Sequence, residues 1–241
     1  MGQVNILERS KRLIQRLKHM NPSLIFLLDP VMGDDQKMYV SPEMLPVYRE
    51  LCALADFVFP NAFEAESVLR QFDRSPSFRL LSGIKITDTL SALEAIHKIH
   101  EMGSKTVILT SGEFTDKASG SLYLIASTRT TPHSYLRFMI QLPKHECRFT
   151  GTGDLFAALV LGYLDSAVPI EDSLIVIVEK ASGAIQSVLQ RTMDNVDKRR
   201  ALMCERDTPS NAKERSSREL CIIESKRVIE DPPRPFKAIL F

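Results

Sequence analysis

The hydrophobic positions of this chain form two kinds of pattern that alternate along it. Residues 6–20 predict an amphipathic helix, with basic side chains outward and four apolar side chains inward. The four inward positions are Ile6, Leu13, Ile14 and Leu17. Residues 24–28 are continuously apolar, which is typical of a parallel strand buried on both faces. The sequence therefore predicts an α/β fold, with helices flanking a central, mostly parallel sheet.

The same patterns continue through the rest of the chain. We expect helices over 41–52, from 87–90 to about 103, from the turn at 151–153 onward, and from 169 to about 192. We expect strands over 55–59, 106–112, 121–126, 135–142 and 219–223, with a turn at 129–132. Residues 194–218 are highly polar, and a solvated loop or a partly frayed helix is expected there.

Composition and charge narrow the class of protein. The 241 residues are 44% hydrophobic and 25% charged, as in an ordinary soluble protein, so we expect one domain over 1–241. A formal net charge of +1 gives no reason to expect a nucleic-acid or membrane partner. Four widely spaced cysteines without a CxxC pair favour reduced thiols. Since no apolar run could span a bilayer and no signal-peptide core is present, a cytoplasmic location is expected.

A glycine-rich stretch, Thr150-Gly151-Thr152-Gly153-Asp154, precedes an apolar helical pattern. The first N–H groups of a helix have no intrahelical partner, and glycines let that backbone approach a ligand closely. The free amides and the helix dipole attract an anion such as a phosphate. An aspartate there repels a phosphate, but it suits a base that deprotonates an attacking hydroxyl. In the alternative interpretation, Asp154 is a helix N-cap and the glycines form a loop.

Two further polar clusters follow predicted strands. Asp29 stands at the carboxyl end of the apolar run 24–28, where open α/β sheets bind ligands, although an aspartate before a proline also caps turns. Asn61 and Glu64 lie three residues apart at a predicted helix start, so both can point toward one site. They also match an N-cap and its capping-box partner, which is a purely structural role.

These motifs together resemble those of the ribokinase-like sugar and vitamin kinases. Within that group, the blocks DPVMGD at 29–34, PNAFEAE at 60–66 and SKRVIEDP at 225–232 are similar to those of pyridoxal kinases. The resemblance runs from about residue 5 to the end of the chain. It implies transfer of the γ-phosphoryl group of ATP to the 5′-hydroxyl of pyridoxal, pyridoxine or pyridoxamine, with a divalent metal such as Mg²⁺, in a homodimer. The related hydroxymethylpyrimidine kinases are the alternative.

The resemblance also assigns roles to residues. It implies that Asp154 accepts the hydroxyl proton and that the amides of Gly151, Thr152 and Gly153 form an anion hole. Metal-site roles are implied for Asp29, Asp34 and Glu64, with Glu64 ordering metal-bound water. Nucleotide contacts are implied for Asp29, Asn61, Glu64, Thr110, Ser111, His145, Glu146, Cys147, Phe149 and Thr152.

Two departures from the family pattern stand out. Phe59 occupies the position of a threonine that helps to hold a monovalent cation, and a phenylalanine ring offers no oxygen ligand. The chain also starts inside what corresponds to the helix after the family's first β-α units, which carry much of the vitamin pocket. We therefore expect an N-terminally truncated fold that keeps the nucleotide half and the base. A catalytically impaired, nucleotide-binding isoform is the alternative function that this expectation leaves open.

Overall fold

The computed structural model of the chain describes residues 4–34, 37–72, 80–145, 147, 149–203 and 219–241, and only the backbone of 34, 71–72, 80–82 and 197–203. The chain forms two compact units. One comprises Met1–Gln141 with Ile239–Phe241, and the other comprises Leu142–Ala238.

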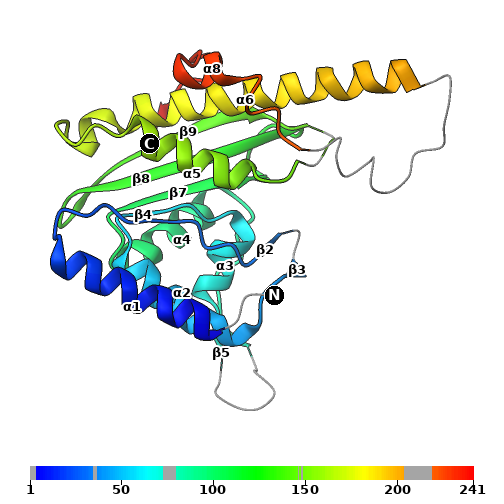
Figure 1. The fold of residues 1–241 in the computed structure, drawn as a ribbon. Helices are drawn as coiled ribbons and strands as arrows, with labels where there is room; N and C mark the ends of the chain where they lie inside the picture. The colour runs from blue at the N-terminus through cyan, green and yellow to red at the C-terminus, as the bar shows by residue number, and fades with distance from the viewer. Residues whose placement is uncertain (1–3, 35–36, 73–79, 146, 148, 204–218) are drawn as a thin grey trace. The chain divides into compact units, whose positions relative to one another are not determined.

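The first unit is built on a six-stranded sheet in the order β1-β4-β7-β8-β9-β10 (Figure 1). Strands β1 (Leu27–Leu28), β4 (Phe57–Val58) and β7 (Thr106–Gly112) run parallel to one another. Strand β8 (Ser121–Thr131) pairs antiparallel with β7, and β10 (Ile239–Leu240) pairs antiparallel with β9 (Ser134–Pro143). The sheet is therefore mixed, and its three parallel strands end at one common edge.

Helices α1 (Val4–Met20), α2 (Leu45–Leu54), α3 (Ala62–Leu69) and α4 (Thr89–Met102) accompany this sheet, with the short 3-10 turn η1 (Pro42–Met44) ahead of α2. In Figure 1, α2, α3 and α4 lie on one face of the sheet. Two short hairpins, β2 (Gly33–Asp34) with β3 (Lys37–Met38) and β5 (Gln71–Phe72) with β6 (Leu80–Ser82), complete the unit. The α/β class and the flanking helices predicted from the sequence are thus confirmed.

Buried apolar side chains explain why the helices dock on the sheet. One core cluster joins α4 to β7 and β8 through Ile96, Val107 and Ile125, which are fully buried. A second cluster joins α2 to β1 and β4 through residues that include Leu51 and Val58. Complete burial of one such side chain contributes roughly 1.5–3 kcal/mol. These contacts hold the three parallel strands in register, and so hold their ends at one edge.

The helix predicted over 6–20 is present as α1, but three of its four predicted inward positions are wrong. Ile6, Leu13 and Leu17 are 61%, 57% and 41% exposed. Ile14 packs against the cluster around α2 as predicted, and Leu7, which was not predicted, packs there as well. Two apolar stripes run along α1, and helical periodicity alone does not say which of them docks.

The strands predicted over 24–28 and 55–59 are shorter than expected. Strand β1 lies at the edge of the sheet and Ile25 is 41% exposed, so the run 24–28 is not buried on both faces. Ahead of β1, the N–H of Phe26 donates to the Asp56 carboxylate at 2.7 Å. This side-chain acceptor takes the place of a backbone carbonyl of a neighbouring strand. The turn predicted at 129–132 also lies slightly later, between Thr131 and Ser134.

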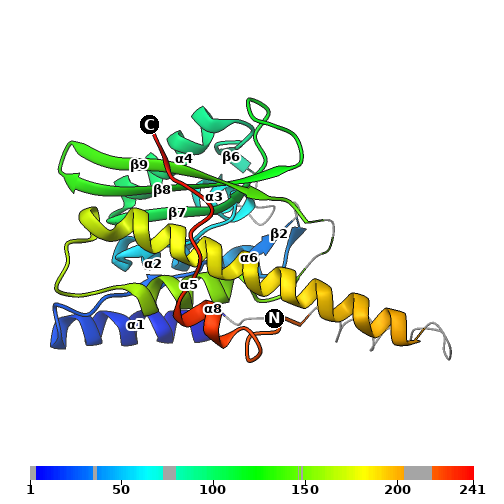
Figure 2. The ribbon, with the colours of Figure 1, turned by 90° about the horizontal axis from the view of Figure 1, so that it is seen from above.

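The second unit contains α5 (Thr152–Tyr163), the long α6 (Ile170–Met203) and the short α8 (Lys226–Glu230), and both α5 and α8 pack against α6 (Figure 2). Two predictions here are wrong in part. The helix predicted to end at about 192 continues as α6 to Met203, so the helical alternative for 194–218 holds over 194–203, while 204–218 lies outside the described residues. The strand predicted over 219–223 is absent, and only Glu219 forms an isolated bridge. No helix in the described part of the chain is long and apolar enough to cross a bilayer.

Candidate functional site

The carboxyl ends of the three parallel strands bring the predicted nucleotide-site residues of the first unit into one row. The N–H of Phe59 donates to the Leu28 carbonyl at 2.9 Å, and the N–H of Thr110 donates to the Pro60 carbonyl at 3.0 Å. Asp29, Asn61 and Ser111 each stand within one residue of these bonds. They are therefore neighbours at the sheet edge where ligands bind in open α/β folds.

Asn61 and Glu64 form the capping box that the sequence suggested as their structural role. The Asn61 side-chain oxygen accepts from the Glu64 N–H at 2.8 Å, and the Glu64 carboxylate accepts from the Asn61 N–H at 3.0 Å. Each side chain also reaches the 29–34 loop. Glu64 accepts from the N–H of Met32 at 3.0 Å, and the Asn61 amide donates to the Gly33 carbonyl at 2.9 Å. The pair therefore fastens two of the sequence motifs together.

Burial makes the Glu64 carboxyl harder to ionise. Glu64 is only 5% exposed, and this burial raises the pKa of its carboxyl to about 7. The hydrogen bonds that it accepts from backbone N–H groups act in the opposite direction. The nearby negative charge of Asp29 raises the pKa further. The pKa of Tyr48 is also raised, by burial and by the charges of Glu64 and Asp29. Two carboxylates thus share one partly buried corner, which a cation would stabilise.

These oxygen donors fit a divalent cation of the Mg²⁺ type, which prefers a few carboxylates together with phosphate and water oxygens. Both Glu64 oxygens already accept a backbone N–H, so this residue suits an outer position that hydrogen-bonds to metal-bound water. Asp29 is half-buried, and the Asp34 side chain lies outside the description. Among the described residues, no three His, Cys, Asp or Glu side chains converge as a ready-made metal cluster. A bound nucleotide would have to supply further ligands.

Phe59 is part of the core. It is 2% exposed and stacks on Phe57 with ring centroids 6.2 Å apart. A phenylalanine ring has no oxygen atom, so this side chain offers no ligand to a monovalent cation.

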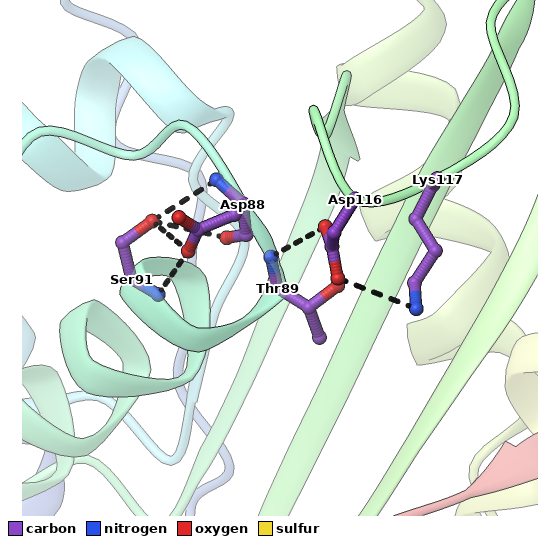
Figure 3. Close-up of polar contacts among 5 residues, drawn as sticks. All are labelled: Asp88, Thr89, Ser91, Asp116 and Lys117. Atoms are coloured by element: carbon purple, nitrogen blue, oxygen red, sulfur yellow. Dashed lines mark hydrogen bonds and ion pairs between the residues drawn. The ribbon is translucent and has the colours of Figure 1, made fainter.

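The loop that follows Thr110 and Ser111 is fastened to the start of α4. Figure 3 shows Asp88 and Ser91 bonded reciprocally at that helix start, and Asp116 reaching Thr89 from the loop after β7. One Asp116 oxygen accepts from both the N–H and the hydroxyl of Thr89, at 3.0 and 3.1 Å. The N–H of Thr115 donates to the Thr87 carbonyl at 2.9 Å. These bonds restrain the loop directly after the predicted nucleotide-contact residues.

In the second unit, the glycine-rich turn starts α5 in the way an anion site requires. Gly151 is the N-cap, with φ of 88° in the left-handed region that favours glycine. Among the residues that the structure describes, no side-chain hydrogen bond caps this end. The interpretation of Asp154 as the N-cap is therefore wrong, because it is the third helical residue. Its side chain is exposed, and the N–H groups of Gly151 to Asp154 are the four that lack intrahelical partners.

The structure describes only some of the predicted nucleotide-contact residues ahead of the turn. Glu146 is among the residues that are not described, and Cys147 is exposed. His145 and Phe149 meet edge to face, with ring centroids 6.3 Å apart. One His145 ring nitrogen lies 2.7 Å from the Gln186 side-chain oxygen on α6. This contact joins the approach to the turn with α6.

Sequence reasoning missed three residues that support these motifs. Tyr48 donates its hydroxyl to the Val31 carbonyl at 3.0 Å, Asp116 holds Thr89, and Gln186 contacts His145. Each is 17 or more residues away from its partner. No local pattern marks them, so pairing information between distant positions would have been needed.

Comparison with known proteins adds an independent finding. The model of the pfkB family carbohydrate kinases matches residues 3–195. The chain is 32% identical to the pyridoxal kinase of Dictyostelium discoideum, over 98% of this chain and 70% of that protein. It is 36% identical to the pyridoxal kinase of Homo sapiens, over 91% of this chain and 66% of that protein. The chain thus spans about two thirds of the length of these relatives.

Solved structures agree with the sequence matches. Pyridoxal kinase from Leishmania donovani in complex with ADP superposes with a TM-score of 0.75 at 27% identity, covering 99% of this chain and 72% of that chain. The same enzyme in complex with ADP and pyridoxamine gives a TM-score of 0.74 at 27% identity, covering 99% of this chain and 71% of that chain.

Proposed function

This chain belongs to the pfkB family of carbohydrate kinases and, within it, to the pyridoxal kinases, and from that premise we propose that it phosphorylates a B6 vitamer. The reaction is transfer of the γ-phosphoryl group of ATP to the 5′-hydroxyl of pyridoxal, pyridoxine or pyridoxamine. The products are pyridoxal 5′-phosphate and its relatives. We further propose that the chain acts in the cytoplasm as a homodimer.

One observation carries this proposal. Gly151 is a left-handed N-cap with no side chain of its own to cap α5, so no N-cap side chain in the described part of the chain competes with an anion for the first amides. An exposed Asp154 stands beside these amides. A serine, threonine, aspartate or asparagine at the N-cap would occupy one of the first amides with its own side chain, which a glycine cannot do. Free amides next to a carboxylate suit a phosphoryl transfer to a hydroxyl, because the two groups act on different parts of the reaction.

Each residue then has a definite task. The Asp154 carboxylate accepts the proton of the vitamer hydroxyl as that oxygen attacks the phosphorus. The amides of Gly151, Thr152 and Gly153 donate hydrogen bonds to the oxygens of the transferred group, where negative charge increases. In the first unit, Thr110, Ser111 and Asn61 are the proposed nucleotide contacts. In the second unit, the proposed contacts are His145 and Phe149. Positioning and charge neutralisation provide most of the rate in such reactions.

Asp29 and Asp34, with Glu64 acting through water, would hold a divalent metal such as Mg²⁺. When bound, that ion supplies positive charge beside the phosphate oxygens of ATP. Support comes from the nearby carboxylates of Asp29 and Glu64, because the negative charge of Asp29 makes ionisation of Glu64 less favourable. A cation would offset this repulsion. We propose no monovalent-cation site at Phe59, because its ring is buried in the core.

The direct test incubates the purified chain with ATP and Mg²⁺ and with pyridoxal, pyridoxine, pyridoxamine or hydroxymethylpyrimidine in separate reactions. Mass spectrometry then identifies any phosphorylated product. Phosphorylation of the B6 vitamers supports the proposal, and phosphorylation of hydroxymethylpyrimidine alone contradicts the substrate. Absence of product, combined with a melting temperature that ATP and Mg²⁺ raise, assigns nucleotide binding without turnover and contradicts the kinase activity.

A further inference from the structure

The glycine-rich turn lacks a side-chain cap at its N-cap position. Gly151 takes a left-handed conformation, and the N-cap position has no side-chain hydrogen bond. Because glycine is free to take many conformations, such a turn loses its shape easily unless something else restrains it. An anion hole needs amides that are fixed before the charge develops. The restraint must therefore come from outside the turn.

A distant segment, Glu219 to Ser225, lies directly against the turn. Glu219 forms a parallel bridge with Thr150, the residue before Gly151. A Cβ added to Gly151 would lie 4.0 Å from Leu220 Cδ1, which places the Leu220 side chain beside this glycine. The segment therefore meets the turn through a backbone bridge at Glu219, and the apolar side chain of the next residue, Leu220, lies beside Gly151.

The same segment is anchored to α6. The N–H of Cys221 donates to the Thr192 hydroxyl at 3.0 Å, and the Asn195 amide lies 3.2 Å from the Cys221 sulfur. Thr192 is 1% exposed, so this anchor is buried in the second unit. Arg191 donates to the Glu224 carbonyl. The segment therefore contacts both the turn and α6. It lies about seventy residues after the turn in the sequence.

The segment adds little to the core of the unit. Ile222 and Ile223 are 44% and 89% exposed, so its apolar side chains next to Leu220 face solvent. A stretch that served only to pack would bury them. Its close contacts go to the turn and to the last described part of α6 instead.

We infer that Glu219 and Leu220 are positioning residues that hold the Gly151–Asp154 turn in the shape its amides need. This inference deepens the proposed function and rests on it for the role of the turn. It does not require these residues to touch ATP or the vitamer. The C-terminal segment is thereby part of the machinery that sets the turnover rate.

The first arm of the test needs no activity. Hydrogen exchange of the peptides that cover 149–156 is measured for the full chain, for Leu220→Ala and for the matched control Ile223→Ala. We expect Leu220→Ala to speed exchange in 149–156 about tenfold or more, because a local restraint has been removed. In Leu220→Ala, the peptides of α4 should exchange as they do in the parent chain. In the control Ile223→Ala, every peptide should exchange as it does in the parent chain. Equal protection of 149–156 in Leu220→Ala and the parent chain would overturn the inference.

The second arm measures steady-state kinetics with ATP and pyridoxal. Leu220→Ala should lower kcat by about tenfold to a hundredfold with little change in KM for ATP, since misplacement of catalytic groups affects the transition state most. Leu220→Met should restore most of the rate. Unchanged kcat in an active chain would overturn the inference. If the parent chain shows no turnover, the proposed function fails, while the exchange arm still decides whether the segment holds the turn.

A milder variant covers the case in which Leu220→Ala unfolds the chain. Leu220→Val removes a single methylene and is compared with the parent chain in the same exchange experiment. Faster exchange confined to 149–156 supports the inference. Exchange that is unchanged, or faster to the same degree in every peptide, overturns it.

Discussion

The Glu64 carboxylate accepts a hydrogen bond from the N–H of Met32 at 3.0 Å. This bond joins the helix start after one parallel strand to the loop after its neighbour. The same carboxylate closes the capping box with Asn61, so one side chain stabilises a helix and shapes a loop. A structural role and a role at the ligand site are therefore combined in one residue, and neither excludes the other.

Glu64 should make Mg²⁺ binding depend on pH. Its pKa in the folded protein is raised to about 7, so the carboxyl binds a proton below that pH, and a cation must displace it. We expect the dissociation constant for Mg²⁺ to rise as pH falls below 7, by up to about tenfold per pH unit. Titration calorimetry of Mg²⁺ into the chain saturated with ADP, at pH 6, 7 and 8, measures this constant.

Two variants separate Glu64 from other proton-linked groups. Glu64→Gln should flatten the pH dependence of Mg²⁺ binding, whereas Glu94→Gln, an exposed position on α4, should leave it as in the parent chain. The same slope in Glu64→Gln and the parent chain would show that this carboxyl is not the linked group.

His100 should weaken the fold in mild acid. Its imidazole lies between the Ser104 carbonyl and the Ser127 hydroxyl, each at 2.9 Å, and burial lowers its pKa to about 4. The unfolded chain binds a proton at His100 below about pH 6.5, but the folded chain does not until about pH 4. The free energy of unfolding should therefore fall by about 3 kcal/mol from this group as pH drops through that window.

Urea unfolding at several pH values tests this expectation. The pH dependence should become shallower in His100→Gln between pH 6.5 and 4, and it should persist in His97→Gln, whose half-exposed side chain lies on the same helix. If His100→Gln loses stability in acid as steeply as the parent chain, another group is responsible.

Asp116 should influence nucleotide binding without contacting the nucleotide. It holds Thr89 from the loop that follows Thr110 and Ser111, so its loss frees that loop (Figure 3). We expect Asp116→Ala to raise KM for ATP by roughly three- to tenfold through misplacement of the strand end, with a smaller change in kcat. Lys117→Ala is the control, because Lys117 only pairs with Asp116 at 3.4 Å near the surface. Equal KM in the Asp116 and Lys117 variants would refute a positioning role.

Two glycines, the N-cap of α5 and one within that helix, should change the stability in opposite directions when replaced by alanine. At Gly151 there is space for a Cβ, but φ of 88° is unfavourable for alanine, so Gly151→Ala should cost about 1–2 kcal/mol of unfolding free energy. Gly162 lies within the helix with no atom near an added Cβ, so Gly162→Ala should add roughly 0.5–1 kcal/mol. Denaturant unfolding measures both values, and a gain in stability at Gly151 would disprove the strain argument.

The predicted features that succeeded depend on residues close in the sequence. The capping box of Asn61 and Glu64 and the helix after Gly153 are each encoded within a few positions, so local patterns reveal them. Features that failed depend on distant partners. The inner face of α1 is set by α2, and the bridge from Thr150 to Glu219 joins residues 69 positions apart, so a strand was expected where only one bridge forms.

The Asp154→Asn variant tests the central claim most directly. The substitution keeps the shape of the side chain but removes its ability to take the hydroxyl proton. We expect kcat for pyridoxal phosphorylation to fall by about 10²–10⁴-fold, with the dissociation constant for ATP unchanged. Asp172→Asn, an exposed position in the first turn of α6, should retain the full rate. Turnover by Asp154→Asn at the rate of the parent chain would contradict the account.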